Sequence, residues 1–120
     1  MKMHDLIRDR ATSTHYQWGD HCDGWFLVNS PELTIIEERM PSGTAEKSHY
    51  HLKAEQFFRI LSGVATFVLS GEHFEVEAGS GLYVPPLTIH QIRNDHQGDL
   101  VFLVISRPST QGDRIEEQQG

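Results

Sequence analysis

The chain has little cysteine and little clustered positive charge. Among its 120 residues Cys22 is the single cysteine, so no disulfide can form within the chain. No stretch is rich in lysine and arginine, and the formal net charge is -7 with histidine neutral. Because nucleic-acid binding requires a clustered basic surface that neutralises phosphates, we expect no nucleic-acid partner.

Long apolar segments are missing as well. The longest one, LVFLVIS at residues 100–106, is far shorter than the roughly 20 residues with which a helix crosses a bilayer. The N-terminal stretch MKMHDLIRDRATSTHYQW has charges on both sides of a short apolar pair and lacks the apolar core of a signal peptide. We therefore expect a cytoplasmic protein with no membrane partner.

Helical patterns are scarce, and short strand patterns take their place. Residues 2–10 are the best helix candidate. Elsewhere, β-branched and aromatic segments alternate with turn signals at a spacing of about 8–12 residues, which is typical of a sandwich or barrel. The predicted strands are residues 25–28, 33–40, 48–51, 56–61, 64–69, 74–78, 89–94 and 100–106. We expect one all-β domain over residues 1–120, with a barrel core over about 25–107 and loose polar tails at about 1–14 and 109–120.

Two of the eight histidines alternate on a predicted strand. His49 and His51 stand two residues apart, and side chains at this spacing point to the same face of a strand. Imidazole is mostly unprotonated near neutral pH and is the commonest metal ligand in proteins. The pair can therefore chelate one ion, but such pairs also occur by chance on exposed strands, and the spacing alone leaves both interpretations open.

The residues around this pair follow a longer pattern with fixed spacing. Its other positions are Gly43, Gly63, Gly79, Pro85, His90 and Asn94. Over residues 43–94 the sequence resembles the two-part signature of the cupin superfamily. The resemblance implies a jelly-roll-type barrel, the double-stranded β-helix, and a metal bound by both parts of the signature. One departure is Leu87, which replaces a turn glycine, so we expect that this turn does not need a positive φ.

Glu55 and Gln56 compete for the remaining ligand position. Gln56 has the family spacing to Gly63, whereas Glu55 has the family spacing to the second histidine. Strand parity puts Gln56 on an apolar face with Phe58, and puts Glu55 on a charged face with Arg59. Since unpaired buried charge is costly, the face of Gln56 should line the barrel. We predict that a divalent metal is bound by His49, His51, Gln56 and His90, with Glu55 outside.

A neutral amide ligand changes the chemistry that such a site supports. Three imidazoles and an amide leave a divalent ion with a net charge of about +2, against about +1 with a carboxylate ligand. The more positive site is the stronger Lewis acid and binds anions better. Oxygen activation by Fe(II) typically uses two histidines and a carboxylate, which this set lacks. The sequence does not select among Zn, Ni, Mn, Fe and Cu.

The likeness extends to two groups of small cupins. In its ligand spacing the chain is similar to a group with a His-His-Gln-His set that opens unsaturated uronic-acid monomers. That group has an aspartate on a late strand, and LVFLVIS contains no acid, which counts against the same reaction. In the rest of its sequence the chain looks closer to a broad group of small bacterial cupins marked by CDGW, ERMPSGT, HYH and QFF.

A Lewis-acid enzyme also needs a group that transfers protons. Tyr83 and Glu37 are the candidates for this catalytic role, and a surface or packing role is the alternative for each. Three further residues are placed where they could also reach a pocket: Glu38, Tyr50 and Arg93.

These observations favour a metal-dependent isomerase or lyase that acts on a small polar or anionic molecule, such as a sugar acid. A metal-dependent dioxygenase is the second interpretation, and a non-catalytic module that binds or senses a small molecule is the third. The resemblance also implies a homodimer, for which the apolar WFLV segment at residues 25–28 is a candidate edge.

Overall fold

The computed structural model describes residues 2–117, and most of them lie in strands. Two short 3-10 helices come first, η1 (Met3–Leu6) and η2 (Arg10–Thr12). The strands are β1 (Thr14–Trp18), β2 (Cys22–Asn29), β3 (Thr34–Met40), β4 (His49–His51), β5 (Glu55–Ser62), β6 (Val64–Leu69), β7 (Glu72–Glu77), β8 (Gly81–Val84), β9 (His90–Arg93), β10 (Leu100–Arg107) and β11 (Arg114–Glu116). Neither helix in this part of the chain has the length or the apolar character needed to cross a membrane.

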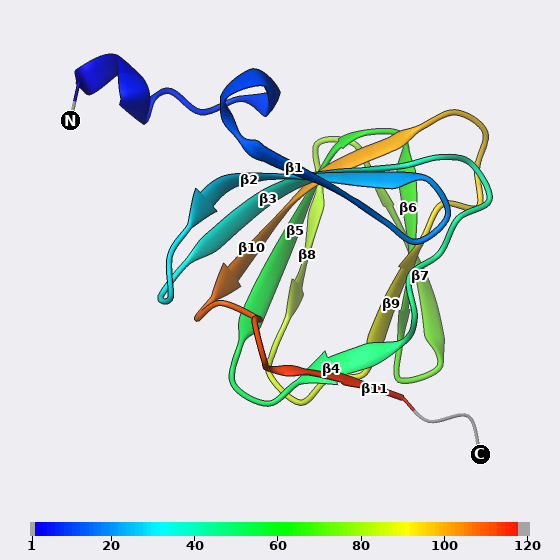
Figure 1. The fold of residues 1–120 in the computed structure, drawn as a ribbon. Helices are drawn as coiled ribbons and strands as arrows, with labels where there is room; N and C mark the ends of the chain where they lie inside the picture. Colours follow the sequence, from blue (N-terminus) through cyan, green and yellow to red (C-terminus); the bar gives the residue numbers. More distant parts are fainter. Residues whose placement is uncertain (1, 118–120) are drawn as a thin grey trace.

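The strands form two antiparallel sheets that face each other, as Figure 1 shows. One sheet has the order β1-β2-β3-β10-β5-β8, and the other has the order β11-β4-β9-β6-β7. Strands that are distant in sequence pair in both sheets, for example β3 with β10 and β4 with β9. This arrangement is the double-stranded β-helix, so the predicted fold class is confirmed.

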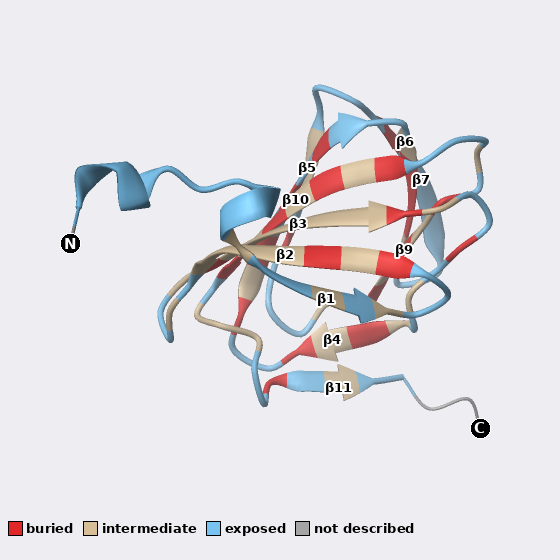
Figure 2. Ribbon diagram, turned by 45° about the horizontal axis from the view of Figure 1, so that its top comes forward, coloured by how far each residue is buried: buried red, intermediate tan, exposed pale blue. Residues whose placement is uncertain are grey.

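The core lies between the sheets and follows the two-residue period of a strand. Every second residue of β10 is buried, and the buried positions of β5 begin at Gln56 (Figure 2). Phe58 of β5 lies with its ring centroid 5.2 Å from that of Phe67 in the opposite sheet. The same ring lies 5.9 Å from Phe102 of β10. The parity predicted for β5 is therefore confirmed: Gln56 points into the barrel, and Glu55 lies on the other face.

Two strands were not predicted: β11 lies within the segment expected to be a loose C-terminal tail, and β1 begins at Thr14, where the expected N-terminal tail ends. β1 pairs along β2, where Tyr16 lies opposite Gly24, and a Cβ at Gly24 would overlap the Tyr16 ring. β11 pairs along β4. Both are polar edge strands without a clear apolar alternation, which is why the sequence did not indicate them. The predicted helix over residues 2–10 is reduced to the single turn of η1.

The WFLV segment is not a sheet edge, contrary to the expectation from sequence. It lies within β2, which pairs with β1 on one side and with β3 on the other. Trp25 is further covered by Arg10, whose guanidinium carbon lies 4.1 Å from the ring centroid. The edges of this sheet are instead β1 and β8.

The turn at Leu87 does have a positive φ, so the expectation that it would not need one is wrong. Leu87 has a φ of 65°, which is the left-handed conformation that glycine adopts most easily. In this conformation its N–H donates to the carbonyl oxygen of His51 at 2.7 Å. A leucine in this region carries a conformational cost of roughly 1–2 kcal/mol. The turn is thereby bonded to the strand that holds two of the predicted metal ligands.

Two signature glycines allow a test of what each one contributes to stability. Gly43 and Gly63 have similar φ values, 81° and 84°. A Cβ on Gly63 would lie 2.8 Å from the carbonyl oxygen of Asp99, whereas no atom lies within 4 Å of a Cβ on Gly43. We expect Gly43→Ala to lower the free energy of unfolding by about 1 kcal/mol through backbone conformation alone. Gly63→Ala should lower it by about 2–4 kcal/mol because steric overlap is added. Urea denaturation measures both losses, and equal losses would contradict a steric role for Asp99.

Candidate metal centre

Three buried histidines meet between the two sheets. His49 and His51 come from β4, and His90 comes from β9, where it pairs directly opposite His49. One ring nitrogen of each histidine lies within 4.8 Å of the other two. None of the three residues is more than 4% exposed. This cluster is a possible metal site, because its nitrogens are close enough to share one ion.

Backbone carbonyl groups fix the tautomer of each imidazole. The Nδ1 atoms of His49, His90 and His51 lie 2.8, 2.8 and 3.3 Å from the carbonyl oxygens of Lys47, Thr88 and Asp113, respectively. A carbonyl oxygen can only accept a hydrogen bond, so each Nδ1 carries the proton and each Nε2 keeps its lone pair. Metal-binding histidines are commonly oriented by such bonds.

Burial keeps the three imidazoles neutral. It lowers the pKa of His49 to about 3 and the pKa of His90 to about 4. Burial also lowers the pKa of His51. The positive charge of Arg114 acts in the same direction on all three. Since a metal binds the neutral form of imidazole, the cluster is ready to bind a cation at neutral pH.

Gln56 adds an amide oxygen that has no partner among the described residues. Its Nε2 donates to the hydroxyl oxygen of Ser106 at 3.0 Å, while its Oε1 is buried and accepts no hydrogen bond. The Nε2 atoms of His51 and His90 are buried and unpaired in the same way. Buried polar atoms are normally satisfied, and these three are all electron-pair donors. The donor set therefore fits a cation.

Glu55 already has partners on the outer face of β5. Its Oε2 accepts a hydrogen bond from the Arg107 guanidinium at 2.7 Å, and its Oε1 accepts one from the Tyr83 hydroxyl at 3.3 Å. The bond from Arg107 holds the pKa of Glu55 below its usual range. Glu55 is thus on the opposite side of the strand from the histidine cluster.

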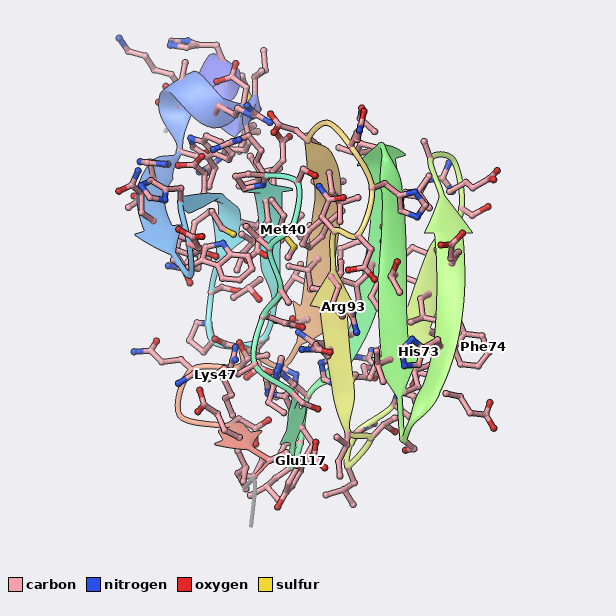
Figure 3. The ribbon with its side chains drawn as sticks, turned by 90° about the vertical axis from the view of Figure 1, so that its right-hand side faces the viewer. Met40, Lys47, His73, Phe74, Arg93 and Glu117 are labelled. Atoms are coloured by element: carbon pink, nitrogen blue, oxygen red, sulfur yellow. The ribbon has the colours of Figure 1, made fainter. Side chains whose placement is uncertain are left out.

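A cavity of about 420 Å³ contains part of this cluster. Its walls include His49, His51 and Gln56 together with Tyr16, Glu38, Glu46 and Arg114. A larger hollow of about 720 Å³ lies near Lys47 and Glu117, which Figure 3 labels, but none of the three histidines lines it. The smaller cavity is therefore the one that combines possible metal ligands with ionisable groups.

Glu38 supplies a carboxyl group to this cavity. It shares the inward face of β3 with Thr34 and Ile36, and both also line the cavity. The Tyr16 hydroxyl donates to Oε1 of Glu38 at 2.8 Å. Burial raises the pKa of Glu38 to about 7, although the bond from Tyr16 and the charge of Arg114 both oppose this shift. Near neutral pH the group can therefore either accept or release a proton.

Glu46 is a second carboxyl group in the cavity wall. Its Oε1 accepts the N–H of Ile92 at 3.1 Å, and its Oε2 lies 4.0 Å from Nδ1 of His49. Burial, followed by the charge of Glu38, raises the pKa of Glu46 to about 8. The two glutamates and Tyr16 together form an acidic wall of the cavity.

The structure places both predicted catalytic candidates outside the cavity. Tyr83 is 54% exposed and bonds to Glu55 on the outer face. Glu37 points away from the barrel and forms an ion pair with Arg10, because it alternates with Glu38 along β3. Neither residue lines the cavity, so the structure does not bring either candidate to the histidine cluster.

Two further residues considered from sequence are also absent from the cavity wall. Tyr50 lies between the two histidines of β4 and does not line the cavity. Arg93, labelled on β9 in Figure 3, forms an ion pair with Asp95 at 2.9 Å. Glu38 is thus the one member of that group of candidates that lines the cavity.

Three ionisable residues of the cavity wall were missed from sequence: Tyr16, Glu46 and Arg114. Tyr16 and Arg114 lie on β1 and β11, in or beside the segments described as tails. Glu46 lies in the loop before β4, where the alternation of a strand gives no direction. On β3 the alternation separates Glu38 from Glu37, since Glu38 shares a face with the buried Met40 and Glu37 shares the other face with Arg39.

Comparisons with known proteins agree with this fold. The family model described as the cupin domain matches residues 36–106, which is more than half of the chain. The chain belongs to the cupin family. An uncharacterised protein of Methanocaldococcus jannaschii is 35% identical to this cupin over 82 residues. The match covers 68% of this chain and 66% of that relative, just under two thirds of its length.

Solved structures share the cupin fold at low sequence identity. KdgF from Halomonas sp. has a TM-score of 0.79 at 15% identity, and the match covers 88% of this cupin and 97% of that chain. A sugar phosphate isomerase from Silicibacter pomeroyi, described as a member of the cupin superfamily, has a TM-score of 0.75 at 18% identity. That match covers 86% of this cupin and 76% of the other chain. At these identities the likeness shows the fold alone.

A pair of neighbouring variants tests the fourth ligand. We expect Gln56→Ala to weaken binding of Zn²⁺ by at least about tenfold, because it removes an inward donor. Glu55→Ala should leave the affinity unchanged, because its carboxylate lies on the outer face. Competition with a chelator, together with elemental analysis, measures both affinities. Metal retained in Gln56→Ala but lost in Glu55→Ala would reverse the assignment.

The raised pKa of Glu38 predicts a pH-dependent change in stability. A folded-state pKa of about 7 against an ordinary 4.5 means that the folded protein holds this proton more tightly. The resulting stabilisation is complete below about pH 4.5 and is lost as the pH rises through 7. In metal-free protein, Glu38→Gln should therefore gain up to roughly 3 kcal/mol relative to wild type between these pH values. Denaturation across this range measures the difference. Glu37→Gln is the matched control and should show no such gain.

Proposed function

We propose that this cupin is a metal-dependent isomerase or lyase that acts on a small polar or anionic molecule, such as a sugar acid. One observation carries the proposal: three of the four neutral donors, His49, His51 and Gln56, line the same cavity as the half-buried Glu38 carboxyl group. In this proposal His49, His51, Gln56 and His90 would hold a divalent ion. Such an ion supplies Lewis-acid polarisation of a substrate carbonyl group.

Glu38 is assigned the proton transfer. Isomerisation or elimination beside a carbonyl group begins when a base removes a proton from the adjacent carbon, and the electron pair moves toward the carbonyl oxygen. An isomerase then returns the proton to the neighbouring carbon. In a lyase the electron pair instead forms a carbon–carbon double bond, and the leaving group departs with the electrons of its own bond. A carboxyl group with a pKa of about 7 suits both the removal and the return of a proton at neutral pH.

The remaining walls of the cavity support binding of a small molecule. Tyr16 holds one oxygen of Glu38 and so orients the carboxyl group. Four apolar side chains contribute to the lining: Phe26, Ile36, Phe58 and Val104. A volume of about 420 Å³ lies within the usual range for small-molecule sites.

The donor set and the fold relationship favour this chemistry over the alternatives. Oxygen activation by Fe(II) usually requires two histidines and a carboxylate as ligands. Gln56 offers an amide in place of the carboxylate, which argues against a dioxygenase. The sugar phosphate isomerase of Silicibacter pomeroyi has the same fold, which is consistent with an isomerase on this scaffold. We also propose a homodimer in the cytoplasm, and analytical ultracentrifugation tests its mass.

A substrate screen under argon tests the proposed reaction. Protein loaded with Zn²⁺, Mn²⁺ or Ni²⁺ is incubated in D₂O with sugar acids and with hydroxy and keto acids. We expect deuterium at the carbon beside a carbonyl group together with an isomerised or eliminated product, followed by NMR. Glu38→Gln should lower the rate by about 10²–10⁴, because the base is lost. Glu37→Gln should leave it near wild type.

Three results would contradict the proposal. In a parallel screen in air with Fe(II)-loaded protein, turnover that requires and consumes oxygen would identify a dioxygenase. Tight binding of a metabolite with no turnover under any condition would identify a binding module. Wild-type protein that retains no metal after reconstitution would remove the basis of the proposed chemistry.

A further inference from the structure

The C-terminal segment at residues 109–116 forms a wall of the cavity, and it lies outside the region matched by the cupin family. That match ends at residue 106. Four side chains of the segment line the cavity: Ser109, Thr110, Gln111 and Arg114. β11 pairs with β4 so that Arg114 lies opposite His51. The region that the family model matches therefore does not include this part of the wall.

Asp113 anchors the segment to the turn that follows the two histidines. Its carboxylate accepts hydrogen bonds from the backbone N–H groups of residues 52–54, at 2.9–3.3 Å. Its own carbonyl oxygen accepts the bond from Nδ1 of His51. Asp113 is buried, with 9% exposure. The position of the neighbouring Arg114 is thus fixed relative to the histidine cluster rather than set by a free tail.

Arg114 is the one lysine or arginine side chain in the cavity wall, and its own contacts are weak. Its Nη2 donates to the carbonyl oxygen of Lys47 at 3.4 Å, and its Nε lies 3.8 Å from the carboxylate of the exposed Glu116. Within residues 2–117, no carboxylate lies within 3.5 Å of this guanidinium. Arg39 is different, because it binds Asp23 at 2.8 Å and Asp99 at 3.1 Å.

A guanidinium that faces a cavity without a close carboxylate is suited to bind one from a ligand. Its planar fork matches both oxygens of a carboxylate, and charge-assisted bonds of this kind are among the strongest hydrogen bonds. The charge of Arg114 also reaches Glu38, whose pKa it lowers against the effect of burial. A carboxylate bound at Arg114 would therefore lie within electrostatic range of the proposed base.

We propose that Arg114 binds the carboxylate of the substrate, so that the cavity selects small hydroxy or keto acids over neutral sugars. This inference rests on the proposed function, because it names the substrate class of the same site. Thr110 and Gln111 line the cavity in the same segment and offer neutral hydrogen-bonding groups for the hydroxyl or carbonyl oxygens of such an acid.

Two sugars that differ at one carbon provide the test. D-Glucuronate has a carboxylate where D-glucose has a hydroxymethyl group. Calorimetry with Zn²⁺-loaded wild type should show at least tenfold tighter binding of D-glucuronate. Arg114→Gln should lose at least tenfold in affinity for D-glucuronate and should leave binding of D-glucose unchanged. Arg114→Lys keeps the charge but not the planar fork, so its affinity should lie between those of wild type and Arg114→Gln.

Matched controls separate this inference from folding and from the metal site. Arg107→Gln removes an exposed arginine on the outer face and should behave as wild type. Thermal unfolding and the zinc content of Arg114→Gln should also equal those of wild type. Metal-loaded wild type that does not prefer D-glucuronate, or Arg114→Gln that binds it normally, would overturn the role of Arg114 alone. Loss of zinc from wild type would instead count against the proposed function.

Discussion

The hydrogen bonds from three imidazole Nδ1 atoms to backbone carbonyl oxygens are the interaction on which the centre depends. They set one tautomer in His49, His51 and His90, and so aim a lone pair from each ring. The accepting carbonyl groups belong to Lys47, Thr88 and Asp113, which lie one or two residues before β4, β9 and β11, so their positions are tied to the starts of these strands. A shift of one residue in β4 would turn both of its histidines to the other face. The chemistry of the site is thus coupled to the register of the barrel.

Burial of these groups opposes folding and favours binding of a cation. Removing the partner of a buried polar atom costs about 1–3 kcal/mol, and three possible ligand atoms have no hydrogen-bond partner among the described residues: two imidazole nitrogens and the Gln56 oxygen. The same burial lowers the histidine pKa values and raises that of Glu38, because both effects disfavour charge. One physical cause therefore yields neutral donors and a carboxyl group that titrates near pH 7.

The sequence predicted those features that strand periodicity controls. Alternation in β5 correctly separated Gln56 from Glu55, and the fixed spacing of the signature correctly indicated the fold. Periodicity carries no information about loops and polar edge strands, which is why Glu46 and Arg114 were not found. The left-handed Leu87 was missed for another reason: a hydrogen bond to His51 imposes a conformation that the residue type does not favour. Along β3 successive side chains point to opposite faces, so Glu38 points into the barrel and Glu37, the candidate for proton transfer from sequence, points outward.

The region that the family model matches and the edge strands outside it contribute different groups to the cavity. Residues 36–106 contain the three histidines, Gln56, Glu38 and Glu46, which include the proposed metal ligands and the proposed base. β1 and β11 lie outside this region and bring Tyr16 and Arg114 into the same cavity. β1 and β11 are the outermost strands of their sheets and pair with β2 and β4 through the backbone, so their side chains can vary without changing that pairing. The edges are therefore where this cupin can acquire selectivity for its substrate while the central chemistry stays constant.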